Sequence, residues 1–207
     1  MKQLLFFLLL SINSFSQQRP NIIYIMSDDH DADAISAYNK QFIKTPNIDR
    51  IAKEGMKFNK AFVGNSICSP ARATLLTGQH SHKNGVKDNR TKFDSSKTTI
   101  AHLLHDAGYQ TSIIGKWHLH SYPVGFDYWR VLPGMGQYFD TRMITMNGDT
   151  ITEKGYSAEA LTADAINWLE NRDKNKTFRF FLSPQSTTSK FCSRIKIFRR
   201  VSYKNIS

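Results

Sequence analysis

The sequence is poor in cysteine, and it has no hydrophobic run long enough to cross a membrane. Its 207 residues contain only two cysteines, Cys68 and Cys192, which excludes the small domains that depend on a network of disulfides. The longest apolar run, residues 4–10, is too short for a transmembrane helix. Internal repeats and low-complexity stretches are also missing. A chain of this length can form one domain of ordinary size.

The N-terminus has the order of features that is typical of an export signal. Lys2 precedes the apolar run, and small residues follow it at Ser14 and Ser16. We predict a signal peptide over residues 1–16 and a mature protein that is periplasmic or secreted, with no membrane attachment after cleavage. An uncleaved anchor is the weaker interpretation, because no second hydrophobic segment follows.

Acidic residues are missing from both ends of the chain. The formal net charge is +11, from 28 basic and 17 acidic residues. Neither the predicted signal nor the segment after Leu182 holds an acid. One base lies in the signal and six follow Leu182: Lys2, Lys190, Arg194, Lys196, Arg199, Arg200 and Lys204. The part between them is only mildly basic, so we expect no nucleic-acid partner for it.

Apolar strands alternate with amphipathic helices along the chain, which predicts an α/β fold with a mostly parallel sheet. The strands are expected at residues 20–26, 56–63, 109–114 and 177–182, and the helices at 45–55, from Ser69–Pro70 onward, at 98–106 and at 156–171. Residues 125–140 are expected to be an irregular excursion over the surface. In such folds, ligand sites gather beyond the carboxyl ends of the strands. Asp28–Asp29 and the segment 116–118 follow two of the predicted strands.

Cys68 lies where a helix is expected to begin, because Ser69 is a good N-cap and Pro70 fits the first helical position. Amide donors and the positive end of the helix dipole favour a thiolate or an oxyanion there. Arg72 follows one turn later on the same side. This pattern predicts a reactive centre for an anionic substrate, whereas the alternative is a buried cysteine that packs as a small hydrophobe.

The run from Cys68 through Pro70 and Arg72 to Leu76-Thr77-Gly78 resembles the signature of the type I, formylglycine-dependent sulfatases. The second signature of that family is similar to Gly115-Lys116-Trp117-His118-Leu119. The resemblance implies an alkaline-phosphatase-like sandwich and a sulfuric ester hydrolase. It also implies that a maturation enzyme oxidises Cys68 to formylglycine. A disulfide between Cys68 and Cys192 is therefore disfavoured.

The resemblance also assigns roles to the candidate site residues. Asp28, Asp29 and Cys68 look like the metal site, with the two carboxylates as ligands of a divalent cation that we expect to be Ca²⁺, because carboxylates suit a hard ion. Arg72 is implied to activate the formylglycine hydrate. Lys116 is implied to bind the sulfate, and His118 to orient and deprotonate the hydrate. Without the resemblance, an Asp pair capping a turn and solvated surface charges are the alternatives.

The segment Gly125-Phe126-Asp127-Tyr128-Trp129, with Leu132-Pro133-Gly134, is similar to bacterial glycan sulfatases that include N-acetylglucosamine-6-sulfatase-like enzymes. The implied substrate is a sulfated carbohydrate. The aromatic side chains could stack on sugar rings or belong to the core, and the sequence leaves both uses open.

The resemblance covers residues 20–182, which we take as the N-terminal part of a sulfatase catalytic domain. Residues 183–207 are interpreted as an aberrant basic tail, and further metal and sulfate ligands of the family have no counterpart. We therefore expect this chain to be inactive or poorly folded by itself. Two alternatives stay open: a phosphatase or phosphodiesterase of the same superfamily, or a non-catalytic anion-binding protein.

Overall fold

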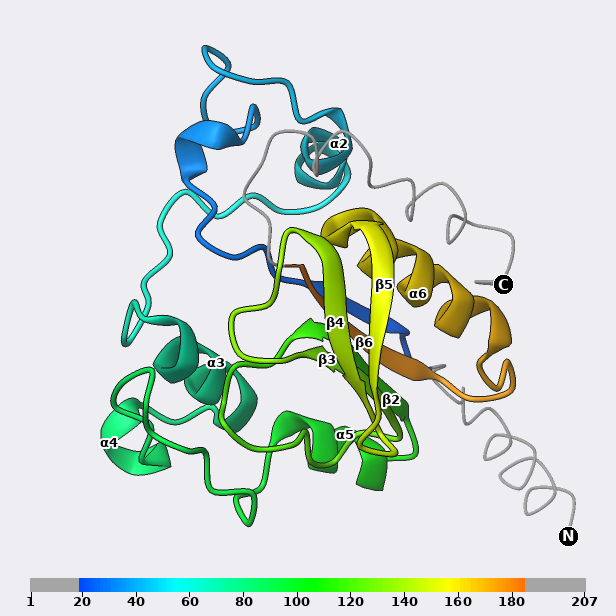
Figure 1. Cartoon of the computed structure of the whole chain (residues 1–207). Helices are drawn as coiled ribbons and strands as arrows, with labels where there is room; N and C mark the ends of the chain where they lie inside the picture. Colours follow the sequence, from blue (N-terminus) through cyan, green and yellow to red (C-terminus); the bar gives the residue numbers. More distant parts are fainter. Residues whose placement is uncertain (1–18, 185–207) are drawn as a thin grey trace, which may run out of the picture.

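The computed structural model describes residues 19–184, which form a six-stranded sheet with the strand order β1-β6-β2-β3-β4-β5 (Figure 1). The strands are β1 (Ile22–Ile25), β2 (Gln110–Lys116), β3 (Tyr128–Leu132), β4 (Phe139–Thr145), β5 (Thr150–Tyr156) and β6 (Phe178–Ser183). β1, β6, β2 and β3 run parallel, whereas β4 and β5 are antiparallel. The predicted α/β fold with a mostly parallel sheet is confirmed.

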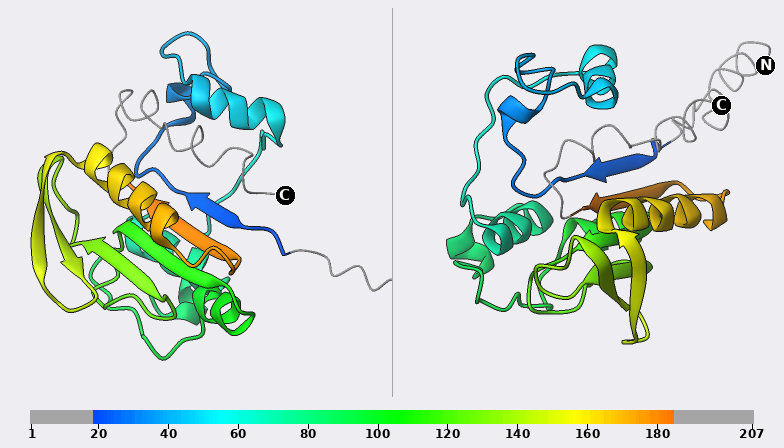
Figure 2. Two further views of the ribbon diagram at one scale, coloured as in Figure 1. Left: turned by 90° about the vertical axis from the view of Figure 1, so that its right-hand side faces the viewer. Right: turned by 45° about the horizontal axis from the view of Figure 1, so that its top comes forward.

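Helices cover both faces of the parallel strands, so the molecule is a layered sandwich (Figure 2). The helices are η1 (Ala32–Ala34), α2 (Pro46–Glu54), α3 (Cys68–Thr77), α4 (Ser81–Asn84), α5 (Ile100–Asp106) and α6 (Ser157–Asn171). α6 packs on one face through Leu161 and Trp168, which join Phe180 of β6 in one core. α3 packs on the other face, where Ala73 and Leu76 join a second core. Side chains alternate between the two cores along the four parallel strands.

Two local predictions are wrong. Residues 56–63 alternate like a strand but form a loop, in which the Phe62 side chain is 96% exposed. A strand needs a neighbour to accept its backbone hydrogen bonds, and this segment stands away from the sheet with α2 (Figure 2). The excursion expected at 125–140 instead contains β3 and the start of β4. β5 was not predicted.

The helix that carries Cys68 begins two residues earlier than expected. Ile67 is the N-cap and Cys68 is the first helical residue, so Pro70 occupies the third position. Gly78 ends the helix in a left-handed conformation with φ of 67°, which glycine adopts without strain. Cys68 lies at the helix N-terminus, as the sequence predicted, but inside the first turn rather than just before the N-cap.

Gly115 lets β2 and β6 approach each other unusually closely beside the ends of these strands. It has φ of +109°, and a Cβ atom placed on it would lie 2.2 Å from the Ser183 carbonyl oxygen. Only glycine fits such a contact. The close approach places Ser183 next to Lys116, the last residue of β2.

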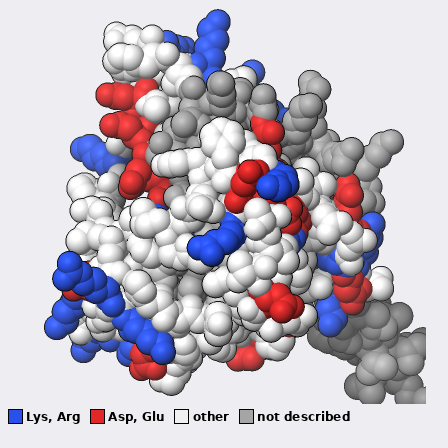
Figure 3. All heavy atoms as spheres, viewed as in Figure 1, with Lys and Arg blue, Asp and Glu red and all other residues white. Residues whose placement is uncertain are grey.

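Charged side chains of both signs are interspersed over the face shown in Figure 3. In residues 19–184, no helix is long and apolar enough to span a bilayer. The predicted signal, nearly all of the predicted tail, and Cys192 lie outside the described residues.

Candidate active site

Three segments that are distant in sequence meet at the carboxyl ends of the parallel strands. Asp28 follows β1, Cys68 begins α3, and Lys116 ends β2. The Lys116 Nζ lies 3.8 Å from the Cys68 Sγ, and that sulfur lies 4.0 Å from the Asp28 Oδ1. Lys116 was expected just beyond its strand, but it is the final strand residue and is completely buried.

Asp28 holds two buried cations together. Its Oδ2 accepts a hydrogen bond from the Lys116 Nζ at 2.5 Å, and its Oδ1 lies 3.5 Å from the Arg72 Nη2. The Arg72 Nη1 donates to the Lys116 carbonyl oxygen at 2.6 Å and to the Ser183 Oγ at 2.9 Å. Burial lowers the pKa of Arg72, and the charge of Asp28 opposes that effect. Removal of the Asp28 carboxylate would therefore leave the desolvated positive charges of Arg72 and Lys116 without a counter-charge.

Asp28, Asp29 and Cys68 form the one group among residues 19–184 that could hold a metal ion. Their potential ligand atoms all lie within 4.8 Å of one another. Asp29 is exposed and has φ of 45°, which aspartate adopts more readily than most residues. Both carboxylates thus lie beside Cys68, as the sequence predicted.

His118 also belongs to this end of the sheet. It follows β2 at a turn with φ of 54°, and its carbonyl oxygen accepts a hydrogen bond from the Ser69 Oγ at 2.6 Å. The residue is buried, and its Nδ1 has no hydrogen-bond partner within the described part of the chain. The bond from Ser69 ties the turn that carries His118 to the helix that carries Cys68.

Comparison with known proteins identifies the family. A family model described as Sulfatase matches residues 20–198. The chain belongs to the sulfatase family. It is 49% identical over 164 residues to N-acetylglucosamine-6-O-sulfatase of Bacteroides thetaiotaomicron, an alignment that covers 78% of this chain and 29% of the relative. The chain thus spans less than a third of that curated relative.

Solved structures agree with this assignment. One solved structure, with 43% sequence identity and a TM-score of 0.80, covers 90% of this chain and 39% of the other, and it was solved in complex with its substrate D-glucosamine-2-N,6-O-disulfate. A phosphonate monoester hydrolase of Agrobacterium radiobacter has 24% identity and a TM-score of 0.62, covering 80% and 40% of the two chains. That second likeness shows the shared fold alone.

Sequence reasoning about this sulfatase chain missed three residues that touch the site. Ser183, assigned to the aberrant tail, is the last residue of β6 and binds Arg72. The Asn89 Oδ1 accepts a hydrogen bond from the Ser69 backbone N–H at 2.9 Å, so it caps the first turn of α3. The Met135 Sδ lies 3.5 Å from the Lys116 Nζ. No local pattern marks these residues, because their partners are distant in sequence.

Three aromatic side chains near the site of the sulfatase chain belong to its core. Trp117 and Trp129 are 4% and 7% exposed and pack in the same core as α3. The Trp117 ring meets the Phe126 ring edge-on, with 6.2 Å between centroids. The structure therefore resolves the alternative that the sequence left open in favour of core packing for Phe126 and Trp129.

Acidification is expected to destabilise the folded chain through His118. Its pKa is lowered by burial, and further by the charges of Lys116, Arg72 and His120, while Asp28 opposes the shift. The unfolded chain therefore takes up a proton at a higher pH than the folded chain does. The stabilisation is complete above the unfolded pKa of about 6.5, and it is lost as the pH falls through the folded value.

Urea unfolding at a series of pH values, in the presence of a chelator, measures this effect. His118→Gln should lose less stability than the wild type as the pH falls below about 6.5. The exposed His82→Gln is the matched control and should retain the wild-type slope. Equal slopes for all three proteins would contradict the assignment to His118.

Proposed function

We propose that this chain forms the nucleophile- and anion-binding part of a glycan sulfatase site that acts on a 6-O-sulfated glucosamine. The observation that carries the proposal is the convergence of Cys68, Asp28 and Lys116, with 3.8 Å from Lys116 and 4.0 Å from Asp28 to the cysteine sulfur. The similarity to an N-acetylglucosamine-6-O-sulfatase supports the choice of sugar.

Lys116 is assigned to sulfate binding. Its ammonium group is completely buried, yet it lies beside the Cys68 sulfur, so an anion at this position would meet a cation that has already lost its water. Charges that are preorganised in this way stabilise a developing negative charge more strongly than charges in water do. Arg72 is assigned a positioning role, because its two terminal nitrogens are committed, Nη1 to Ser183 and the Lys116 carbonyl and Nη2 to Asp28.

Cys68 is assigned as the site of formylglycine formation. When present, the hydrated formylglycine supplies a nucleophilic hydroxyl, together with a second hydroxyl that a thiol lacks. The first turn of α3 offers backbone N–H groups near residue 68, which favour negative charge on that side chain. His118, whose lowered pKa keeps its ring neutral near pH 7, is available as a proton acceptor.

Asp28 and Asp29 would hold a divalent cation next to residue 68. The donor set fits a hard ion in part, because two carboxylates supply oxygen ligands, and the described residues supply no histidine to this group. A bound cation would neutralise charge on the sulfate oxygens. We assign the ion as Ca²⁺, held weakly, because Asp28 already pairs with Lys116 and Arg72.

Added Ca²⁺ is expected to raise the melting temperature of the chain, with half of the effect at about 10⁻⁴ to 10⁻³ M, since weakly held Ca²⁺ sites have such affinities. Asp29→Asn should remove most of this shift, because it removes a ligand without disturbing the pairs made by Asp28. Differential scanning fluorimetry in Ca²⁺ and in chelator measures the difference. Asp149→Asn, at an exposed acid far along the chain, is the control. The same Ca²⁺ shift in both variants would contradict the assignment.

Maturation of Cys68 tests the function itself. The chain is co-expressed with a formylglycine-generating enzyme, and the tryptic peptide of residues 61–72 is analysed by mass spectrometry and captured with an aldehyde-reactive probe. We expect conversion of Cys68 to the aldehyde, with Cys68→Ala as the negative control. This readout does not require turnover, so it is informative even if the 207 residues alone release no sulfate.

The alternatives give different results in the same preparation. An unmodified Cys68 together with phosphate release from an aryl phosphate would favour the phosphatase alternative. An unmodified Cys68 with salt-sensitive binding of anionic glycans, lost on deletion of residues 190–204, would favour the non-catalytic anion-binding protein. Either outcome would overturn the sulfatase proposal.

We also propose that the protein acts outside the cytoplasm. The order of residues 1–16 supports export, and a sulfated glycan is an extracellular type of substrate. N-terminal sequencing of the protein recovered from the periplasm or medium tests this. A mature N-terminus shortly after Ser16 is expected, and recovery of uncleaved chain only in the cytoplasm would contradict it.

A further inference from the structure

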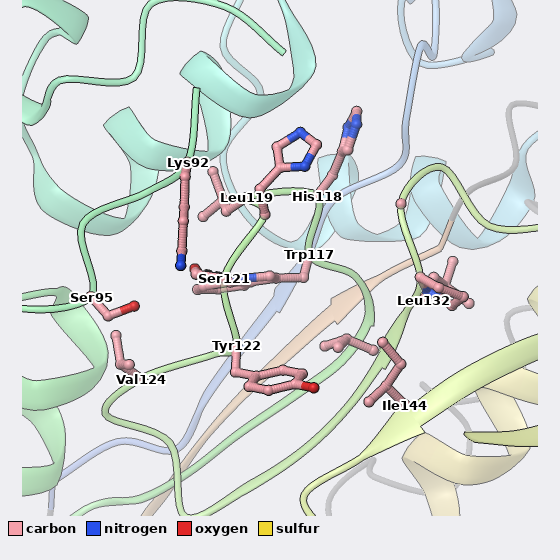
Figure 4. A pocket seen from close by; sticks show the side chains of 14 residues that line it. Lys92, Ser95, Trp117, His118, Leu119, Ser121, Tyr122, Val124, Leu132 and Ile144 are labelled. Atoms are coloured by element: carbon pink, nitrogen blue, oxygen red, sulfur yellow. Dashed lines mark hydrogen bonds between the residues drawn. The ribbon is translucent and has the colours of Figure 1, made fainter. Parts of the chain in front are cut away.

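A pocket of about 450 Å³ lies directly beside the candidate active site (Figure 4). It shares His118 with that site, and it is bounded by Pro133 and Gly134, which precede Met135. The Met135 Sδ contacts the Lys116 Nζ at 3.5 Å. The pocket is thus connected to Lys116 by the turn that carries His118 and by the loop that carries Met135. Its volume is within the range of small-molecule sites.

An aromatic side chain forms an exposed wall of the pocket. Tyr122 is 60% exposed, yet its ring stacks on the buried Trp129 with 5.6 Å between centroids and 21° between planes. The stack holds the tyrosine ring in place before any ligand arrives. Trp117 lies behind it, and its Nε1 faces the Ser121 Oγ at 3.4 Å. A flat, preformed aromatic surface with hydroxyl groups nearby suits the face of a pyranose ring.

The polar groups of the pocket favour a ligand with negative charge. Figure 4 shows the Lys92 ammonium pointing into the pocket, with the Ser95 hydroxyl nearby. Lys92 makes no hydrogen bond or ion pair with any residue between 19 and 184, and none of the residues that line the pocket is acidic. Lys92 is exposed, and no residue within the described part of the chain pairs with its ammonium group, so an anionic substituent of a ligand would pair with it.

We propose that this pocket binds a second sugar ring with an anionic substituent, next to the ring whose sulfate faces Lys116. The inference rests on the proposed function for its account of the neighbouring ring, but the pocket's own chemistry is independent of Cys68. Tyr122 stacks on the ring and Lys92 pairs with its anionic group. The anion is a carboxylate or a sulfate, because both give oxygen acceptors for an ammonium donor.

Ligand-observed NMR on the purified 207-residue protein tests the pocket. The probes are glucuronic acid, N-acetylglucosamine-6-sulfate, neutral N-acetylglucosamine and inorganic sulfate. We expect saturation transfer to the ring protons of the charged sugars, with glucuronic acid and the sulfated sugar separating carboxylate from sulfate recognition. Neutral N-acetylglucosamine should bind about tenfold more weakly, which is the effect of one charge-assisted hydrogen bond.

Matched variants connect the binding to the named side chains. Lys92→Gln should reduce binding of the charged sugars about tenfold and leave the neutral sugar unchanged. Tyr122→Ala should weaken all the sugars, whereas Tyr122→Phe, which keeps the stack, should restore them. Lys83→Gln and Tyr138→Ala, at exposed positions away from the pocket, should bind like the wild type.

Several results would overturn the proposal. They are full competition by inorganic sulfate with no loss on Tyr122→Ala, equal loss in the control variants, or no saturation transfer at any sugar concentration up to the solubility limit. The two proposals fail separately. Binding that persists in Cys68→Ala while wild-type Cys68 stays unmodified would refute the sulfatase proposal and leave the pocket intact. Conversion of Cys68 to formylglycine without sugar binding would refute the pocket proposal and leave the sulfatase proposal intact.

Discussion

Asp28→Asn is expected to destabilise the folded chain by about 3 to 5 kcal/mol, because it breaks a buried ion-pair network from its centre. Lys116 and Arg72 have side chains that are 0% and 5% exposed, and both pair with the Asp28 carboxylate. An amide in its place would leave two desolvated cations without a counter-charge and would turn its N–H₂ group toward one of them. Urea unfolding in the presence of a chelator measures the loss.

The neighbouring acid provides the control for this prediction. Asp29→Asn removes the same charge from an exposed side chain and should change the free energy of unfolding by less than about 0.5 kcal/mol. The double variant Asp28→Asn/Lys116→Met should recover part of the loss, because one of the two buried cations is gone. Similar losses for the two single variants would show that burial of the ion pairs is not the cause.

Gly115→Ala is expected to cost about 3 kcal/mol or more, from a steric overlap added to an unfavourable backbone conformation. The added Cβ would lie 2.2 Å from the Ser183 carbonyl oxygen and 2.8 Å from its carbonyl carbon, at φ of +109°. Backbone atoms cannot swing away as a flexible side chain can, so β2 and β6 must separate. Ser183 would then lose its hydrogen bond with Arg72, and the site would loosen with the sheet.

Gly148→Ala separates the two contributions to that cost. Gly148 has φ of +85°, but an added Cβ there meets no atom within 4 Å. It should cost only the conformational strain of about 1 to 2 kcal/mol. The difference between the two variants in urea unfolding gives the cost of the close strand approach. Equal losses would refute that explanation of Gly115.

Patterns of short range predicted the parts of the fold that depend on short-range forces. The helix at Ser157–Asn171 has an apolar face with helical spacing, and it was predicted within one residue of its observed start. The strand observed at Phe178–Ser183 was predicted at 177–182, within one residue of each end. By contrast, the alternation of residues 56–63 gave a false strand, because nothing in that segment shows whether a neighbouring strand exists to pair with it.

In the candidate site, too, the relations within one helix were predicted and the contacts between distant segments were not. Cys68 and Arg72 lie four residues apart in one helix, so their relation follows from helix geometry. Lys116 was found through its motif but placed just outside the strand, where it would have been partly solvated. Only the pairing of β2 with β6 and the cover of Asp28 make it a fully buried cation.

By itself, the sequence determined which chemical groups this sulfatase chain can offer: a cysteine in the first turn of a helix, a pair of carboxylates after a strand, and a lysine and a histidine after another. The tertiary structure decided which of them touch. β6 comes last of the six strands in the chain, yet it inserts between β1 and β2 and brings Ser183 to Arg72. The physical reason is that sheet order depends on the packing free energy of the whole domain, whereas local patterns record only the preferences of neighbouring residues.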